Sequence, residues 1–85
     1  GQAAGAISHA LGTELHYITE GAGTLVTGGT IVRPEKGTPF IEGGVSRRVK
    51  VGDVVLIPES TPHWYKDVEG VVTYLEVRFN VPMKQ

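Results

Sequence analysis

Short runs of alternating apolar and polar residues, separated by glycines, set the pattern of this chain. Residues 14–19 alternate, and residues 71–79 form the longest such run. Glycine pairs at 28–29 and 43–44 are typical of two-residue hairpin turns, and residues 21–23 and 67–70 predict further turns. No stretch shows a convincing 3.6-residue period, so the pattern predicts seven or eight short strands.

The run 71–79 separates its side chains by polarity. One face carries Val71, Thr73, Leu75, Val77 and Phe79, and the other carries Val72, Tyr74, Glu76 and Arg78. An apolar face opposite a mixed one is typical of an antiparallel strand with one wall on the core. The regular strand spacing predicts an all-β fold, either a sandwich or a small barrel.

Composition narrows the function classes. The chain has 85 residues and no cysteine, so it forms one domain without a disulfide or a cysteine-bound zinc. A domain this short needs a metal, a partner chain or good packing to be stable. The net charge is −1 and the basic residues are scattered, which disfavours nucleic acid and anionic membranes as partners.

No apolar run approaches the ~20 residues of a membrane-spanning helix. The compartment, cytoplasmic or exported, stays open. Residues 1–6 are small and predict a flexible N-terminal end, followed by a single domain over residues 7–85.

Two prolines bound a short loop in front of a histidine. Pro58 and Pro62 restrict the backbone here, so the side chain of His63 leaves the loop at a fixed angle. A metal ligand needs such an orientation in advance.

The spacing around this loop resembles the second motif of the cupin superfamily. Members of this superfamily are small antiparallel jelly-roll β-barrels with a metal site inside. In this chain the corresponding residues are Gly52, Pro58, Ser60, His63 and Asp67, separated by five, one, two and three residues. Ser60 stands where the family has Gly, and Asp67 where it has Asn.

An earlier segment is similar to the first cupin motif. His9 precedes Glu14 by four intervening residues, and six more separate Glu14 from Gly21, while Ile7 replaces the first histidine. The resemblance implies an antiparallel jelly-roll (cupin) β-barrel. A cupin has one or two strands before this point, so we expect an N-terminal edge strand to be absent or supplied by a partner chain. We therefore expect a homodimer.

The resemblance implies that His9, Glu14 and His63 are the metal ligands. Two imidazoles and one carboxylate suit a divalent transition metal such as Fe, Mn, Zn or Ni. The alternative is that His9 lies in a mobile end and that Glu14 is an ordinary surface residue.

Two further residues are candidates for catalysis. His16 shares a strand face with Glu14, so it could replace the ligand lost at Ile7, act as a base beside the metal, or be a polar lining residue bonded to a neighbour. Tyr65 shares the face of His63 and could donate a hydrogen bond to substrate. Trp64 should point the other way, into packing or a subunit contact.

Three functions remain open from the sequence. The first is a metal-dependent enzyme, an oxygenase, isomerase or lyase, acting on a small organic substrate. The second is a non-catalytic small-ligand binding or sensory module. The third is a structural barrel with a decayed metal site, because the fold alone does not fix function.

Overall fold

Strands alone form the regular structure of the described chain. The computed structural model describes residues 5–8 and 12–80, and none of these residues forms a helix, so none forms a helix that could cross a membrane. The strands in chain order are β1 (Thr13–Thr27), β2 (Thr30–Val32), β3 (Phe40–Glu42), β4 (Val45–Lys50), β5 (Val54–Ile57) and β6 (His63–Phe79). The prediction of an all-β fold is confirmed.

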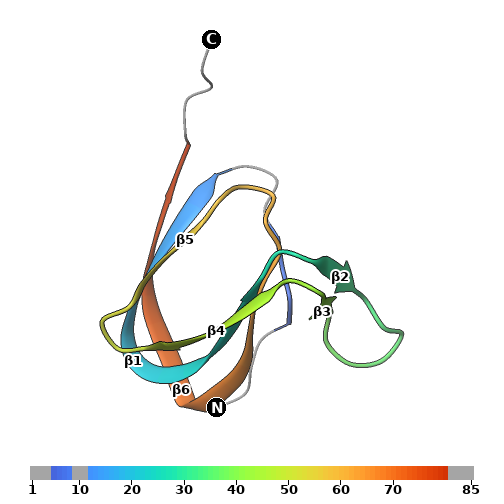
Figure 1. Cartoon of the computed structure of the whole chain (residues 1–85), viewed down its shortest axis with the longest axis horizontal. Coiled ribbons are helices and arrows are strands. Elements are labelled where there is room, and N and C mark those ends of the chain that lie inside the picture. Colours follow the sequence, from blue (N-terminus) through green and yellow to red (C-terminus); the bar gives the residue numbers. More distant parts are fainter. Residues whose placement is uncertain (1–4, 9–11, 81–85) are drawn as a thin grey trace.

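Strand β1 organises the larger sheet (Figure 1). Its first half pairs with β5 and its second half with β4, both antiparallel, while β6 pairs along its other edge. Strands β2 and β3 form a separate two-stranded sheet. In the described part of the chain the two sheets do not close into a barrel, so the jelly-roll barrel stays a prediction.

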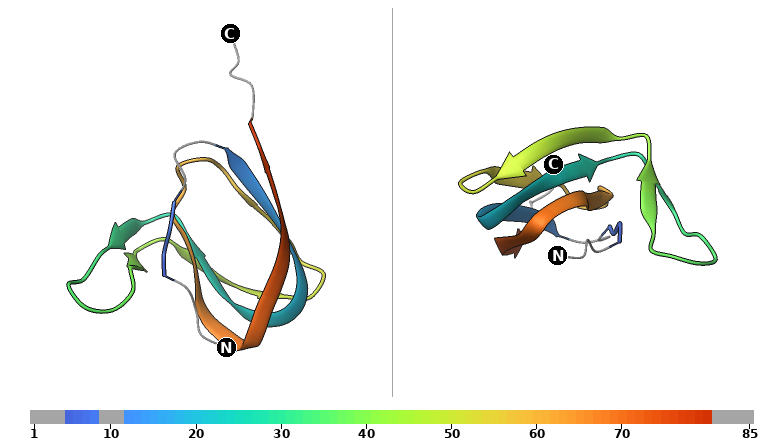
Figure 2. Two further views of the ribbon diagram at one scale, coloured as in Figure 1. Left: turned by 180° about the vertical axis from the view of Figure 1, so that it is seen from behind. Right: turned by 90° about the horizontal axis from the view of Figure 1, so that it is seen from below.

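The two glycine pairs do not form hairpin turns, and that prediction is wrong. Thr27 pairs with Val45, and Thr30 pairs with Glu42, so both glycine pairs lie side by side within one long hairpin. All four glycines have positive φ angles, which lets both chains kink together from β1 and β4 into β2 and β3. Figure 2 shows this two-stranded extension projecting from the main sheet, with residues 33–39 as its turn.

The turns predicted at residues 21–23 and 67–70 are wrong as well. Both segments lie inside continuous strands, and β1 and β6 pair across them with several register shifts. Gly21 has a φ of 84°, and a Cβ atom there would collide with the backbone oxygen of Val71. The glycines therefore bend the strands and let the two backbones approach closely.

Two clusters of side chains form the core. The larger consists of Ile18, Leu25, Val49, Val55 and Ile57, and the smaller of Ala6, Val26 and Ile41. Trp64 packs against the smaller cluster, so its predicted packing role is confirmed.

The apolar face of β6 does not pack on this core. Val72 and Tyr74 pack against the larger cluster, whereas Leu75 and Val77 are 62% and 55% exposed. The mixed face of β6 points inward, where its polar side chains line a cavity. The apolar face of β6 points outward.

Candidate metal site and pocket

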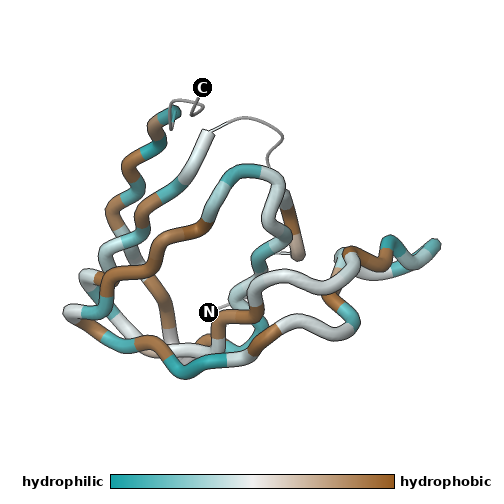
Figure 3. The backbone as a smooth tube through the Cα atoms, turned by 45° about the horizontal axis from the view of Figure 1, so that its top comes forward, coloured by the Kyte–Doolittle hydropathy of each residue, from teal (hydrophilic) through white to brown (hydrophobic). Residues whose placement is uncertain are grey.

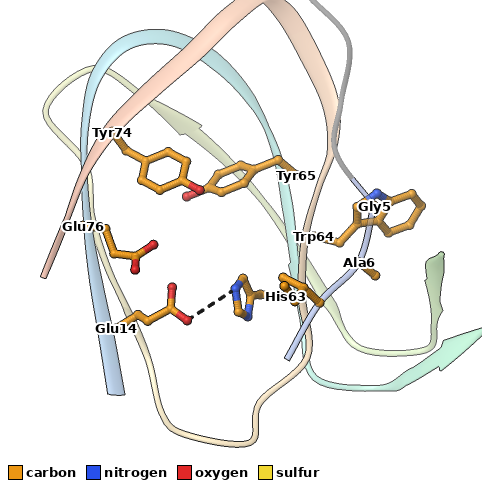
Figure 4. Close-up of a pocket in the computed structure, with 9 residues that line it drawn as sticks. Gly5, Ala6, Glu14, His63, Trp64, Tyr65, Tyr74 and Glu76 are labelled. Atoms are coloured by element: carbon orange, nitrogen blue, oxygen red, sulfur yellow. Dashed lines mark ion pairs between the residues drawn. The ribbon is translucent and has the colours of Figure 1, made fainter. Parts of the chain in front are cut away.

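A cavity of about 450 Å³ lies between the N-terminal segment, the start of β1 and both halves of β6. Its lining consists of Gly5, Ala6, Ile7, Glu14, His63, Trp64, Tyr65, Tyr74 and Glu76 (Figure 4). Because β6 bends at residues 67–70, its first half and its second half form opposite walls of the same cavity. The segment that the sequence predicted to be a turn is therefore a bend within β6, and this bend shapes the pocket.

Glu14 is the buried centre of the polar network. The residue is 2% exposed, and its Oε1 atom lies 2.8 Å from Nε2 of His16. Its Oε2 atom lies 3.7 Å from Nε2 of His63 and 3.7 Å from Nη2 of Arg78. One carboxylate thus faces two imidazoles and a guanidinium, and burial of its charge requires such partners. The alternative that Glu14 is a surface residue is wrong.

His16 lies in the same network, at 1% exposure. Its Nδ1 atom lies 2.8 Å from the hydroxyl of Tyr65, and its ring stacks on Tyr74 with 4.2 Å between centroids. Burial, then the charges of Tyr74, Glu14 and Glu76, raise the pKa of Tyr65 well above its usual range. Tyr65 therefore keeps its proton at neutral pH. When His16 is in the neutral tautomer with its proton on Nε2, the Tyr65 hydroxyl donates a hydrogen bond to Nδ1 and Nε2–H donates one to Glu14.

The neighbouring strands hold His63 in place. The residue is 5% exposed, and its backbone exchanges two hydrogen bonds with Ile7, of 3.0 and 2.8 Å. Its Nδ1–H donates to the carbonyl of Thr61 at 3.1 Å, because a carbonyl can only accept. This bond leaves a lone pair on Nε2, the atom that faces Glu14, when the ring is neutral. The expected fixed orientation of His63 thus has a physical basis in the structure.

Glu76 completes a group of possible metal ligands. Glu14, His16 and Glu76 each offer one ligand atom, and these atoms lie within 4.8 Å of one another, so the cluster could hold a metal ion. Nε2 of His16 is the atom between the two carboxylates, at 2.8 Å from Glu14 and 3.5 Å from Glu76. Two carboxylates and imidazole nitrogens form an O/N donor set that suits divalent transition metals.

The charge of the site favours a cation. With both histidines neutral, Glu14 and Glu76 contribute two negative charges and Arg78 contributes one positive charge. Arg78 lies 3.0 Å from Oε2 of Glu76, and its side chain is 45% exposed, so water screens part of its effect. A net negative charge therefore remains around the pocket.

Most of the residues predicted from sequence meet here. Glu14, His63 and Tyr65 line one cavity, and His16 is hydrogen-bonded to two of them, Glu14 and Tyr65, whereas His9 lies outside the described residues. Sequence reasoning did not name Glu76 as a ligand. Glu76 shares a strand face with Tyr74, which could have pointed to it as a site residue. Polarity alone, however, did not decide whether this face points inward.

Comparisons with protein-family models, with curated proteins and with solved structures give no match for this chain.

Proposed function

We propose that this pocket binds a divalent transition metal and uses it to transform a small organic molecule, within a cupin-like jelly-roll domain. The observation that carries the proposal is the buried Glu14, whose two oxygens face His16 on one side and His63 on the other. A buried carboxylate with imidazoles on both sides and a second carboxylate nearby is the kind of donor set that proteins use to hold such ions.

The ligands are Glu14 and His63, together with His9 as the cupin resemblance implies. His63 Nε2 carries a lone pair when the ring is neutral, and Glu14 Oε2 lies 3.7 Å from it, so these two atoms would both be available to hold a cation. Glu76, from the second half of β6, adds a further carboxylate donor.

The role of His16 at this site depends on where its proton lies. It stays a positioning residue if its Nε2–H keeps donating to Glu14. It becomes a ligand if the ion takes the place of the Nε2 proton, in which case Nδ1–H donates to the Tyr65 oxygen.

When bound, a divalent ion supplies a Lewis acid that polarises a substrate oxygen or supports chemistry with O2. The chain contributes the remaining functions. Tyr65 and Tyr74 extend from opposite walls toward each other (Figure 4), with ring centroids 5.3 Å apart. Burial raises the pKa of both hydroxyls, which therefore donate hydrogen bonds at neutral pH.

The cavity suits a small ligand. Its volume of about 450 Å³ lies within the range of small-molecule sites. The rings of Tyr65 and Tyr74 line the cavity together with the carboxylates of Glu14 and Glu76, and Trp64 lines it at the side of Gly5 and Ala6. Apolar walls with a few convergent polar groups favour a compact organic substrate that carries an oxygen donor for the metal.

Arg78 favours one alternative, a structural domain with a decayed site. Its guanidinium lies 3.0 Å from Glu76 and 3.7 Å from Glu14, so it offsets part of their charge without a metal. In that case the network stabilises the fold and holds no ion.

Metal titration tests the proposal. Metal-free protein is titrated with Ni(II) and Zn(II) by calorimetry, in parallel with the variants His63→Ala and His16→Ala. We expect His63→Ala to weaken binding by more than ~100-fold, because affinity depends on the number of ligands. His16→Ala should cost ~10–100-fold if His16 only positions Glu14. Equal affinities for the wild type and His63→Ala would exclude the proposed site.

A further inference from the structure

The outer face of β5, β1 and β6 is an ordered grid of apolar side chains. Val54, Tyr17 and Leu75 form one row across the three strands, since Tyr17 pairs with both of the others. The row beside it consists of Leu56, Leu15 and Val77, with Leu15 in the centre. Phe79, opposite Thr13, extends the grid at the end of β6. We call these seven residues the outer apolar face.

Solvent reaches most of this face. Val54, Leu56, Leu75 and Val77 are between 55% and 62% exposed, and Tyr17 and Phe79 are 42% and 40% exposed. Figure 3 shows the alternation of apolar and polar residues along β6 toward its C-terminal end. The inner residues of these strands line the core and the pocket, so the apolar residues of this part of the sheet lie on its solvent-facing side. An antiparallel sheet with one solvated face normally alternates apolar and polar residues.

The size of the face can be compared with known interfaces. Seven half-exposed side chains of this kind present on the order of 500 Å² of surface. This is at the upper end of the apolar patches found on monomers. A stable interface buries ~800 Å² per partner, of which ~65% is apolar in homodimers. The outer apolar face therefore supplies about the apolar area that one subunit of a homodimer needs.

The chemistry of the outer apolar face limits the kinds of partner that can cover it. None of its seven residues is charged, and only the Tyr17 hydroxyl can make a hydrogen bond. An anionic membrane would require lysines or arginines, and a polar peptide would require more hydrogen-bonding groups. A second apolar sheet matches the six wholly apolar side chains of this face, and a second copy of this chain offers such a sheet with matching area.

We propose that two copies of this chain pack their outer apolar faces against each other about a twofold axis, as two sheets do in a β-sandwich. Sheets packed face to face lie ~10 Å apart with their strands within ~30° of each other, so the two grids interdigitate. This differs from a dimer made by pairing edge strands. Apart from its pairing with β1, β6 forms a backbone bridge only with Ile7 among the described residues, so the rest of that edge is also available for strand pairing.

The proposed interface lies behind the pocket. Leu15 and Tyr17 alternate along β1 with Glu14 and His16, so dimerisation buries one face of β1 while the other face lines the network. The association stands apart from the proposed function, because it requires neither a metal nor turnover. A metal-free dimer is fully consistent with it.

Light scattering coupled to size exclusion tests this interface, at tens of micromolar, a range that detects moderate affinity. The wild type should elute at about twice the 9.1 kDa of one chain. The variant Val77→Glu places a charge in the grid and should shift the mass to that of one chain. Val45→Glu is the matched control, because Val45 is also a strand valine, is 56% exposed and lies outside the grid. It should stay dimeric.

Leu56→Glu, on a different strand of the grid, repeats the test. Circular dichroism verifies that each variant keeps its strands. A wild type that is monomeric at these concentrations would overturn the proposal. A dimer that survives both Val77→Glu and Leu56→Glu would also overturn it, and would indicate edge pairing of β6 instead. A monomer that becomes bound only when a longer form of the chain or a lipid vesicle is added would assign the face to another occupant.

Discussion

At the scale of single residues, the account depends on how Glu14 is surrounded. Its two oxygens face His16 and His63, and Arg78 competes with any cation for the second oxygen. Removal of a competing positive charge strengthens the binding of a cation, whereas removal of a purely structural partner does not.

Arg78→Gln should therefore raise metal affinity. A partly exposed charge contributes ~0.2–1 kcal/mol, so we expect a gain of about two- to five-fold in calorimetric titration with Zn(II). Arg47→Gln, an exposed arginine on β4, is the control and should leave the affinity unchanged. If Arg78→Gln lowers the melting temperature and gains no metal affinity, Arg78 is a structural partner of the carboxylates.

Sequence reasoning placed most of these residues for a physical reason. Glu14 and His63 were expected from the resemblance to the cupin motifs, and for His63 the loop between Pro58 and Pro62 added a physical reason. Tyr65 follows from its alternation with His63. Glu76 could not be assigned, because the polarity of residues 71–79 did not decide which face of the strand points inward.

This ambiguity about the inner face has a structural origin. Polarity indicates which face of a strand is buried only when solvent covers the other face. Leu75 and Val77 lie on an apolar outer face that we assign to a partner, so both faces of the strand are suited to burial. The sequence pattern then identifies the strand and not its orientation.

At the scale of secondary-structure elements, the glycines did not show where each strand ends. A positive φ is required both in hairpin turns and where two backbones cross closely. The pairs at 28–29 and 43–44 occupy a kink in a hairpin, and Gly21 occupies the contact between β1 and β6. Residue type alone does not distinguish these environments. The strand-forming segments were predicted well, but the described residues form six strands instead of seven or eight, because β1 and β6 each join two predicted strands.

The contact at Gly21 gives a prediction for the bend that builds the pocket. Gly21→Ala adds a Cβ against the backbone oxygen of Val71 and also strains a φ of 84°, so we expect a loss of at least about 2 kcal/mol. For a domain of this size this is a fall in melting temperature of roughly 10 °C or more.

Gly37→Ala separates strain from collision. Gly37 has a φ of 95°, and nothing lies within 4 Å of the added Cβ, so only the backbone strain applies. Thermal unfolding followed by circular dichroism should show a distinctly smaller fall than for Gly21→Ala. Equal falls would mean that β1 and β6 do not approach as closely as described.

At the scale of the whole molecule, 85 residues with no disulfide must be stabilised by other means. The structure offers two small core clusters, a buried polar network and an apolar outer face. The proposed metal would bind the network from inside the pocket, and the proposed second copy would cover the sheet from outside. Both would stabilise β1, the strand that pairs with β4, β5 and β6.

The measurement that tests the central claim most directly is the metal content of the wild type and of Glu14→Gln. Glutamine keeps the shape of Glu14 and removes its charge, so the fold can be retained while the central donor is weakened. After loading with a mixture of divalent transition metals and removal of the excess, elemental analysis should find about one ion per wild-type chain and a small fraction of that in folded Glu14→Gln. A wild type without bound metal, or a variant with the same content as the wild type, would contradict the account.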